Sequence, residues 1–366
     1  MTSPSSRPLV AVLFGGRSSE HSVSCVTASG VLSALEGTEF EVLPIGITPA
    51  GVWRVVDEWR DYRFDPQDMP VVADNGTQVL PPVAADRAPL REITAEVTVR
   101  ELGVVDVYFP LLHGPFGEDG TLQGLFDLSS TPYVGSGVFA SAASMDKHFM
   151  KMVLRGSGIP TSAWETVTGR EWSDDPAAVT ERVSGLGFPV FVKPARAGSS
   201  MGVSKVSAAS DLGPAVQDAL EHDDKFIVEP MVTGREIECG VLGSLHGEAR
   251  TSVAGEIVMT GDKEFYDFEA KYLDLDGVDL RCPADLPADV QERVQDVALR
   301  TFRAFDCTGL ARVDTFVTVD GQVLVNEINT LPGFTPSSMY PVMWQQTGVD
   351  YTELVTTLLD IALHEN

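Results

Sequence analysis

Lysine is scarce in this chain, and acidic residues outnumber basic ones. The first 146 residues contain no lysine; the lysines are Lys147, Lys151, Lys193, Lys205, Lys225, Lys263 and Lys271. The 53 Asp and Glu residues against 26 Lys and Arg give a formal net charge of −27 at pH 7. Such a negative field repels nucleic acid and anionic membranes, so we expect neither as a partner. Cations gathered in a few motifs instead indicate a local anion site.

Long hydrophobic runs, paired cysteines and two common nucleotide-binding motifs are also absent. No apolar run reaches the ~20 residues of a membrane helix. The four cysteines are scattered without a C-x-x-C pair, which indicates neither a zinc site nor a disulfide scaffold. No G-x-G-x-x-G or G-x-x-x-x-G-K-[ST] is present, which counts against a dinucleotide fold and excludes a P-loop. The apolar start ends at Gly15-Gly16 and is typical of a first strand, so we expect a cytoplasmic protein.

Alternating strand and helix signals predict an α/β protein, and 366 residues are too many for one compact core. In the first segment we expect strands at 9–14, 41–48 and 105–112 and a helix at 22–35. The stretch Trp53–Arg100 is poorly periodic and is interpreted as a hairpin with loops. Later segments are expected to contain helices at 138–155, 211–221, 288–305 and 351–364. We also expect strands at 188–193, 203–206, 225–229 and 235–243, with further strand material to 259.

The stretch Leu310–Thr330 predicts a β-hairpin, because two β-branched runs flank Asp320-Gly321. A two-residue turn there would place Val319 opposite Gln322. Asp314 would then lie opposite Glu327, and Arg312 opposite Asn329, all on one face. The other face would carry core residues, namely Val313, Val317, Leu324 and Ile328.

Two carboxylates opposite each other destabilise a sheet unless a cation lies between them. An oxygen-rich set of Asp314, Glu327 and Asn329 suits Mg²⁺. The alternative is a solvated edge hairpin whose acids lie in water near Arg312. A single bulge would also send half of the set to the opposite face.

Two further motifs indicate a nucleotide site. In FPVFVKPARAGSSMG (Phe188–Gly202), glycines and serines between two strands would let backbone N–H groups approach phosphate, with Lys193 as a point charge. A flexible surface hairpin is the alternative. In KFIVEPMVTGRE (Lys225–Glu236), a connector between two acids could hold a purine, although an exposed linker would have the same composition.

Two loops after strands should meet at the carboxyl edge of the first sheet, namely Phe14–Ser24 and Leu111–Gly120. Glu20 would complement the positive end of a helix, or it could bind a substrate ammonium. His113 is a candidate ligand or acid/base group, although a lone histidine is more often structural.

Two segments nearer the C-terminus could complete a site. Glu264–Tyr272, in a polar loop, alternates aromatic and acidic residues as a lid would. After the hairpin, Gly333 could offer a backbone N–H to an oxyanion. Ser337 and Ser338 could hold a carboxylate.

Taken in order, these motifs resemble those of the D-alanine–D-alanine ligase family, which has the ATP-grasp fold. The residues that carry the resemblance are HGPFGEDGTLQG (His113–Gly124), VKPARAGSSMGVSKV (Val192–Val206), DFEAKY (Asp267–Tyr272), ARVD (Ala311–Asp314) and NEINTLPGFTPSS (Asn326–Ser338). The resemblance implies an N-terminal parallel-sheet α/β domain at 1–135 that binds substrate. Two ATP-grasp domains would follow, at 136–228 with the phosphate loop and at 229–366 with the lid and metal site.

The resemblance also implies roles for single residues. ATP would contact Lys147, Lys193, Gly198, Ser199, Ser200, Glu229, Val232, Glu236 and Lys271. Two Mg²⁺ ions, for which Mn²⁺ could substitute, would be held by Asp314, Glu327 and Asn329. The first D-alanine would bind Glu20 and His113, and the carboxylate of the second would lie near Ser338. Glu20, Ser199 and Tyr272 would position substrate and lid, while Arg312 and Gly333 would stabilise an oxyanion.

The implied reaction joins two D-alanine molecules through an acyl phosphate for peptidoglycan precursor synthesis, in a homodimer. Tyr272 favours an amine nucleophile, whereas relatives that form a D-lactate ester depart from this pattern. Three alternatives remain open at this point: another ATP-grasp ligase including the D-lactate type, a dinucleotide-binding oxidoreductase, and a non-catalytic nucleotide sensor.

Overall fold

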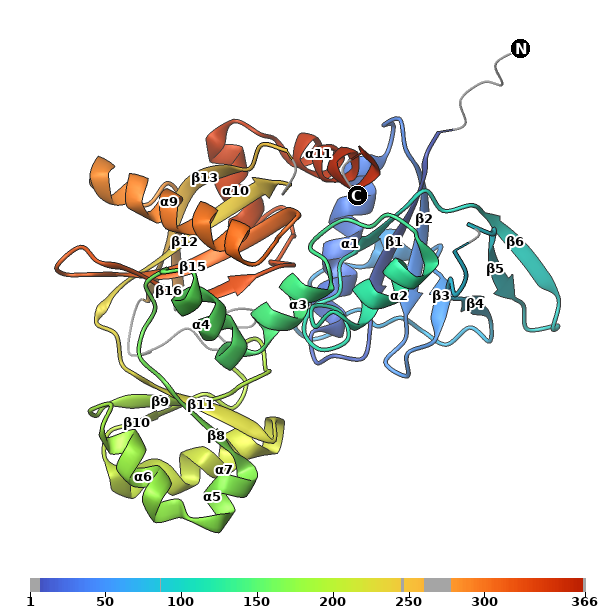
Figure 1. Ribbon diagram of the computed structural model, residues 1–366. Helices are drawn as coiled ribbons and strands as arrows, with labels where there is room; N and C mark the ends of the chain where they lie inside the picture. The colour runs from blue at the N-terminus through green and yellow to red at the C-terminus, as the bar shows by residue number, and fades with distance from the viewer. Residues whose placement is uncertain (1–6, 86, 245–246, 260–277, 365–366) are drawn as a thin grey trace.

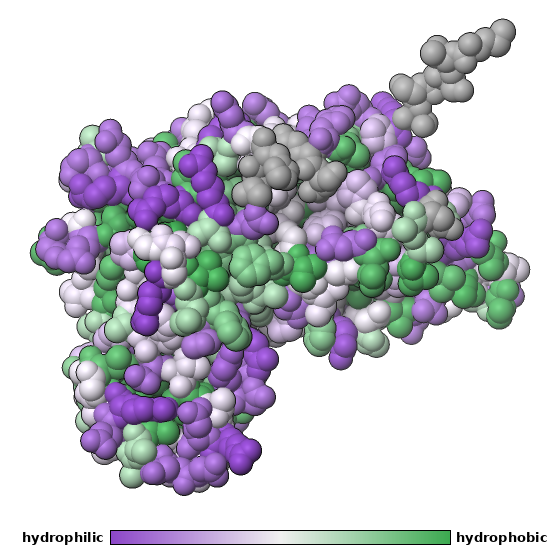
Figure 2. All heavy atoms as spheres, viewed as in Figure 1, coloured by the Kyte–Doolittle hydropathy of each residue, from purple (hydrophilic) through white to green (hydrophobic). Residues whose placement is uncertain are grey.

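Three of the four β-sheets in the described residues form the centres of three lobes in Figure 1. The computed structural model describes residues 7–85, 87–244, 247–259 and 278–364. Within these ranges no helix has the length and apolar composition that crossing a bilayer requires. Figure 2 shows that the lobe built on the second sheet projects from the body formed by the other two.

The first sheet has the strand order β3-β2-β1-β7. β1 (Leu9–Gly15) pairs in parallel with β2 (Glu41–Ile47) and β7 (Val107–Pro110), as predicted, and β3 (Trp53–Val55) is antiparallel. Alternate residues of β1 enter two different cores, one shared with α1 (His21–Leu35) and one with α2 (Thr121–Ser129). Burial on both faces explains why β1 is apolar throughout.

The stretch Trp53–Arg100 contributes to a small antiparallel sheet beside the first one. After the 3₁₀ turn η1 (Trp59–Asp61), the strands are β4 (Gln78–Leu80), β5 (Leu90–Ile93) and β6 (Val99–Gly103). The predicted hairpin is therefore present, with one strand more than expected.

The second sheet is antiparallel, with the strand order β10-β9-β11-β8. Its strands are β8 (Glu165–Thr168), β9 (Val190–Pro194), β10 (Ser204–Val206) and β11 (Lys225–Pro230). The helices of this lobe are α5 (Gly169–Asp174), α6 (Pro176–Ser184) and α7 (Leu212–His222), after the turn η2 (Ala209–Asp211). Buried residues of α6 and α7 share one core with the sheet, so the lobe has its own hydrophobic centre.

The predicted continuous helix from 138 to 155 is wrong, because Asp146 divides it into two. α3 (Val138–Met145) ends there, and α4 (Lys147–Gly156) begins with Asp146 as its N-cap. The Asp146 carboxylate accepts the backbone N–H groups of His148 and Phe149, at 3.0 and 3.3 Å, which stabilises the new helix start. The break also turns the apolar side of α4, so Phe149 is 55% exposed while Met150 and Leu154 are buried.

The third sheet has the strand order β14-β13-β12-β15-β16. Its strands are β12 (Gly234–Gly243), β13 (Arg250–Met259), β14 (Val278–Arg281), β15 (Gly309–Thr318) and β16 (Val323–Asn329). α9 (Ala288–Ala304) shares a core with this sheet, and Met150 and Leu154 of α4 join it. α10 (Met339–Thr347) and α11 (Tyr351–His364) follow, and α11 packs beside α1 of the first lobe (Figure 1).

Candidate active site

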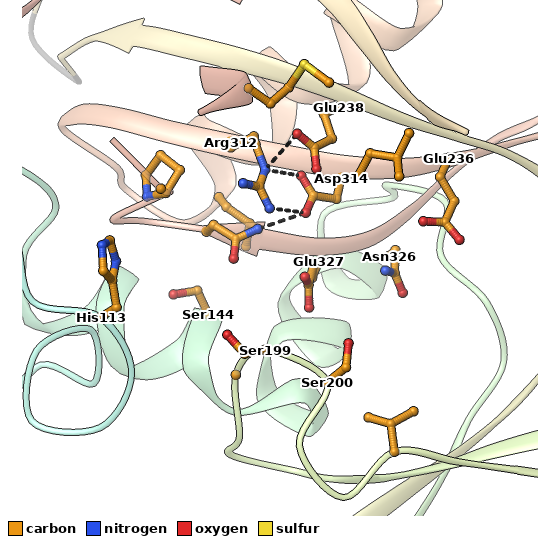
Figure 3. A pocket seen from close by; sticks show the side chains of 18 of the residues that line it. His113, Ser144, Ser199, Ser200, Glu236, Glu238, Arg312, Asp314, Asn326 and Glu327 are labelled. Carbon is orange, nitrogen blue, oxygen red and sulfur yellow. Dashed lines mark hydrogen bonds and ion pairs between the residues drawn. The ribbon is translucent and has the colours of Figure 1, made fainter. Parts of the chain in front are cut away.

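A cavity of 990 Å³ lies where the three lobes meet. The start of α1 borders it on one side. The loop after β7, the loop between β9 and β10, and the β15–β16 hairpin also border it (Figure 3). Every predicted site residue within the described ranges lines it: Glu20, His113, Lys147, Lys193, Gly198, Ser199, Ser200, Glu229, Val232, Glu236, Arg312, Asp314, Glu327, Asn329, Gly333 and Ser338. Lys271, Tyr272 and the predicted lid at 264–272 lie outside the described residues.

The β15–β16 hairpin has the predicted pairs at its open end, since Asp314 lies opposite Glu327 and Arg312 opposite Asn329. The predicted two-residue turn is nevertheless wrong. Thr318 donates its backbone N–H to the Gln322 carbonyl at 3.0 Å, which leaves a three-residue loop. Gly321 in this loop has a φ of +79°, the left-handed conformation that such a loop favours.

A bulge restores the register that the longer loop shifts. Thr315 lies opposite Val325 whereas Asp314 lies opposite Glu327, so Asn326 is an extra residue on β16. The shift near the tip also makes the core assignment of Leu324 wrong. Leu324 is only partly buried, and Val323 and Val325 are the buried residues there.

Arg312 is the centre of a charged network on this face of the sheet (Figure 3). Its guanidinium donates two hydrogen bonds to the Asp314 carboxylate, both at 2.7 Å, and lies 3.3 Å from Glu238 on β12. The Asn329 amide donates to Asp314 at 3.0 Å. Although burial opposes it, Asp314 and Glu238 raise the pKa of Arg312 well above its ordinary value. Glu238 was missed by sequence reasoning because only the pairing of β12 with β15 brings it here.

The donor set around Asp314 fits a hard cation that also binds substrate oxygens. Glu327 and Asn326 extend from β16 toward Ser199 and Ser200 in Figure 3, so the space between hairpin and loop is lined by oxygen atoms. No group of three or more His, Cys, Asp or Glu side chains in the described ranges could hold a metal ion. A set of two carboxylates and one amide would need water or phosphate as further ligands, which is the mode Mg²⁺ prefers.

The loop between β9 and β10 holds two non-glycine residues in left-handed conformations, Ser199 at φ +48° and Ser200 at φ +57°. Strain of this kind persists only where neighbouring structure holds it, and it is common at binding sites. The Lys147 ammonium donates to the Ala197 carbonyl at 2.7 Å, which ties the loop to the start of α4. These contacts favour a phosphate-binding loop over the flexible hairpin considered above.

Glu229, at the end of β11, lies between two lysines. The Lys193 ammonium is 2.9 Å from one of its carboxylate oxygens, and Lys151 is 2.5 Å from the other. Although burial opposes both shifts, the lysines lower the pKa of Glu229 and Glu229 raises the pKa of Lys193. Lys151, which the sequence analysis did not assign to the site, lies behind this wall.

The end of the cavity near α1 is acidic. Glu20 is 8% exposed at the N-cap position of α1, and its Oε1 accepts the Ser199 hydroxyl at 2.5 Å. His113 Nδ1 lies 3.2 Å from the Leu331 carbonyl oxygen, while its buried Nε2 has no hydrogen-bond partner within the described ranges. Burial lowers the pKa of His113 despite nearby Glu20, which favours a neutral imidazole. An orphaned nitrogen at this place is suited to a ligand.

Glu118 is a third site residue that sequence reasoning missed. It lines the cavity and accepts the Gly114 backbone N–H at 2.6 Å. Burial, with the Glu20 charge nearby, raises the pKa of Glu118 to about 8. Its place five residues after His113 in the same loop was the available signal.

The loop after β16 forms another wall of the cavity and lies against α1. Ser338 precedes α10, and its hydroxyl accepts the Thr335 backbone N–H at 3.1 Å. Gly333 lies close by, since a Cβ placed on it would be 3.3 Å from the Ser338 hydroxyl oxygen. One compact turn thus presents both residues to the cavity.

Two family models match this chain. The model described as D-ala D-ala ligase N-terminus matches residues 9–136, and the one described as D-ala D-ala ligase C-terminus matches residues 153–360. A D-alanine--D-alanine ligase of Kineococcus radiotolerans is 53% identical over 365 residues, covering 98% of this chain and 97% of that protein. The enzyme of that name from Streptomyces griseus is 48% identical over 370 residues, covering 98% and 94%.

Solved structures agree in fold. The D-alanine-D-alanine ligase from Coxiella burnetii has a TM-score of 0.82 at 33% identity and covers 98% of this chain and 94% of its own. The VanG D-Ala:D-Ser ligase from Enterococcus faecalis also has a TM-score of 0.82 at 33% identity, covering 97% and 99%. The fold is that of the ATP-grasp ligases, as expected. The two family models together account for most of the sequence, and the chain belongs to the D-alanine–D-alanine ligase family.

Proposed function

We propose that the residues lining the 990 Å³ cavity carry out the ATP-dependent ligation of two D-alanine molecules. The family joins them into D-alanyl-D-alanine, a peptidoglycan precursor of the cell wall, with release of ADP and phosphate. One observation carries the assignment of residues: the hydrogen bond between Ser199 and Glu20 joins the phosphate loop to the acidic end of the cavity.

ATP would lie between the second and third sheets. Glu229, Val232 and Glu236 would surround adenine and ribose. Lys147, Lys193 and the backbone N–H groups of Gly198, Ser199 and Ser200 would contact the phosphates. Lys271 would approach from the segment outside the described residues.

Asp314, Glu327 and Asn329 would hold two Mg²⁺ ions, with Mn²⁺ as a substitute. When bound, these ions would neutralise charge on the transferred phosphoryl group. Two features support this metal site. Asp314 lies opposite Glu327, and hydrogen bonds from Arg312 and Asn329 orient the Asp314 carboxylate.

The first D-alanine would bind with its ammonium at Glu20 and with His113 nearby. Its carboxylate oxygen attacks the γ-phosphorus, a new O–P bond forms, and ADP leaves. Activation is needed because a free carboxylate is a poor acyl donor. Ser199 and Tyr272 would position this substrate together with Glu20.

The second D-alanine would place its carboxylate near Ser338 and attack the acyl carbon with its amine. The C–N bond forms, the C–O bond between the acyl carbon and phosphate breaks, and the amine proton passes to the departing phosphate or to water. Arg312 and the Gly333 backbone N–H would stabilise the tetrahedral oxyanion. The raised pKa of Arg312 keeps the guanidinium charged throughout.

We also propose the domain boundaries 1–135, 136–228 and 229–366, a homodimer, and a cytoplasmic location where ATP is available. The three separate sheets support the division into domains. The net charge of −27 supports the absence of nucleic acid and membrane partners. Sedimentation over a range of protein concentrations tests the dimer, and a monomer throughout would contradict it.

Phosphate release with ATP, Mg²⁺ and either D- or L-alanine tests the function. We expect release with D-alanine only, and dialanine as the product in mass spectrometry. Equal release with both enantiomers would contradict the proposed substrate.

Supplying D-alanine together with D-lactate tests the nucleophile. Tyr272 predicts that the amide forms, and exclusive ester formation would overturn the role of Tyr272. Tyr272→Phe should then shift the product ratio toward ester.

A further inference from the structure

Among the described residues, Lys151 is the most deeply buried cation near the cavity, with a side chain that is 0% exposed. It lies on α4, and its ammonium donates to Thr161 Oγ1 and Ser162 Oγ, each at 2.9 Å. The third contact is Glu229 Oε1 at 2.5 Å. No step of the proposed reaction uses this lysine.

The hydrogen-bond pattern favours a charged Lys151, although burial lowers the pKa of this lysine. The Thr161 hydroxyl donates its proton to the Val325 carbonyl at 2.9 Å, and the Ser162 hydroxyl donates to Glu229 at 2.8 Å. All three neighbours of the Lys151 nitrogen therefore act as acceptors toward it. Only an ammonium has three protons to donate.

The charge balance around Glu229 depends on this ammonium. Lys193 and Glu229 alone would form a neutral pair, in which the carboxylate cancels the positive charge of Lys193 that would attract phosphate. With Lys151 on the other carboxylate oxygen, the cluster of three side chains carries one net positive charge. The Glu229 side chain is 6% exposed and Lys193 17%, so water screens this charge only weakly.

We propose that Lys151 is a positioning residue for nucleotide binding: it occupies one oxygen of Glu229, so that Lys193 keeps a positive charge available to a nucleotide phosphate. This inference rests on the proposed nucleotide site. Lys151 lies behind Glu229 and acts through it.

The Lys151 ammonium also connects Glu229, in the proposed nucleotide site, to β16, which carries Glu327. Thr161 bonds to Lys151 and to the Val325 carbonyl, and Val325 donates its backbone N–H to Pro160 at 2.8 Å. Val325 directly precedes the bulge that sets the position of Glu327. Lys151 thus fixes Glu229 relative to β16.

The test compares the affinities of ADP and adenosine, because only ADP carries phosphate. We expect Lys151→Met to weaken ADP about tenfold to a hundredfold, the value of a charge-assisted contact, while adenosine changes by less than about twofold. Calorimetry on the same folded sample gives both constants. If Lys151→Met weakens the binding of ADP and adenosine equally, the ratio of their dissociation constants stays as in the wild type. Lys151 would then have a merely structural role, and the inference would be overturned.

The double variant Lys151→Met/Glu229→Gln separates charge from packing. It has the same net positive charge as the wild type without the buried ion pair. Its preference for ADP over adenosine should exceed that of Lys151→Met and lie below that of Glu229→Gln alone. If Lys151→Met fails to fold, the double variant is compared with Glu229→Gln alone. An equal ratio of ADP affinity to adenosine affinity in these two proteins would contradict the proposal.

Lys225→Met is the matched control. Lys225 also joins β11 to the start of α4, through an ion pair with Asp146, but it does not touch Glu229 in any contact of the described structure. We expect Lys225→Met to lower the stability of the protein and to leave the ratio of ADP affinity to adenosine affinity unchanged. A change in this ratio as large as that in Lys151→Met would overturn the inference. Wild-type protein that does not prefer ADP over adenosine would instead contradict the nucleotide site itself.

Discussion

The Ser199 hydroxyl donates to Glu20 at 2.5 Å, across a separation of 179 residues in the chain. Ser199 lies in a loop of the second sheet, and Glu20 occupies the N-cap position of the first helix, in another lobe. The hydrogen bond therefore links the lobe that would hold phosphate with the lobe that would hold the amino acid. A contact of this kind aligns two substrates more effectively than two separate sites would.

Ser199→Ala should lower D-alanine-dependent ADP formation by about tenfold to a hundredfold, as expected for loss of a hydrogen bond to a charged group. The KM for D-alanine should rise more than the KM for ATP, because Glu20 loses its orientation. Steady-state assays with each substrate varied measure both constants. Ser184→Ala, at an exposed serine of α6, is the control and should change neither. Wild-type constants in Ser199→Ala would contradict the role.

Glu327→Gln should abolish D-alanine-dependent ADP release, because the amide removes one of the two opposed carboxylate charges. Mn²⁺ binding, followed by electron paramagnetic resonance in the presence of ADP, should weaken in parallel. Asp320→Asn, at the exposed tip of the same hairpin, should leave both measurements unchanged. Near-normal turnover in Glu327→Gln would refute the metal assignment.

Glu118→Gln should remove part of the pH dependence of stability. Burial raises the pKa of Glu118 to about 8 from an ordinary value of 4.5, so between these pH values the folded protein binds more protons than the unfolded chain. The free energy of unfolding must then fall as pH rises through this window. Urea titrations at pH 5 and pH 9 measure it, and the fall should be smaller in the variant. The same slope in both proteins would contradict the raised pKa.

Arg312→Lys should reduce kcat by about a hundredfold, within the range that loss of an oxyanion donor causes. Lysine keeps the charge but cannot make the paired hydrogen bonds to Asp314, both 2.7 Å in the wild type. The affinity for ADP should change much less, since Arg312 does not belong to the nucleotide wall. A loss confined to ADP binding, with normal kcat, would assign Arg312 elsewhere.

The hairpin shows how far local pattern carried the prediction. The sequence predicted that Asp314 would face Glu327, and the structure has this pair. The pair was predicted correctly although the predicted two-residue turn was wrong. The three-residue loop shifts the pairing by one residue, and the bulge at Asn326 shifts it back. Neither irregularity has a strong local signal, which is why Leu324 was placed on the wrong face.

Other misses share a tertiary cause. The helix across 138–155 is broken at Asp146 because that side chain caps a new helix and pairs with Lys225 of another lobe. Glu238 and Lys151 belong to the site only through sheet pairing and through the packing of α4. No window of neighbouring residues contains those partners.

The sequence by itself determined the central strands of the three large sheets, the helices α1, α7, α9 and α11, the order of the binding motifs and the polar face of the hairpin. It did not predict β8, β14, α2, α5, α6 or α10. Side-chain alternation and glycine placement act over a few residues, so they can be recognised without a structure. The tertiary structure alone decided which polar groups meet: Ser199 with Glu20, and Lys151 and Lys193 with Glu229. In the cluster of Lys151, Lys193 and Glu229, the opposite charges then lower the pKa of Glu229 and raise the pKa of Lys193, although burial opposes both shifts.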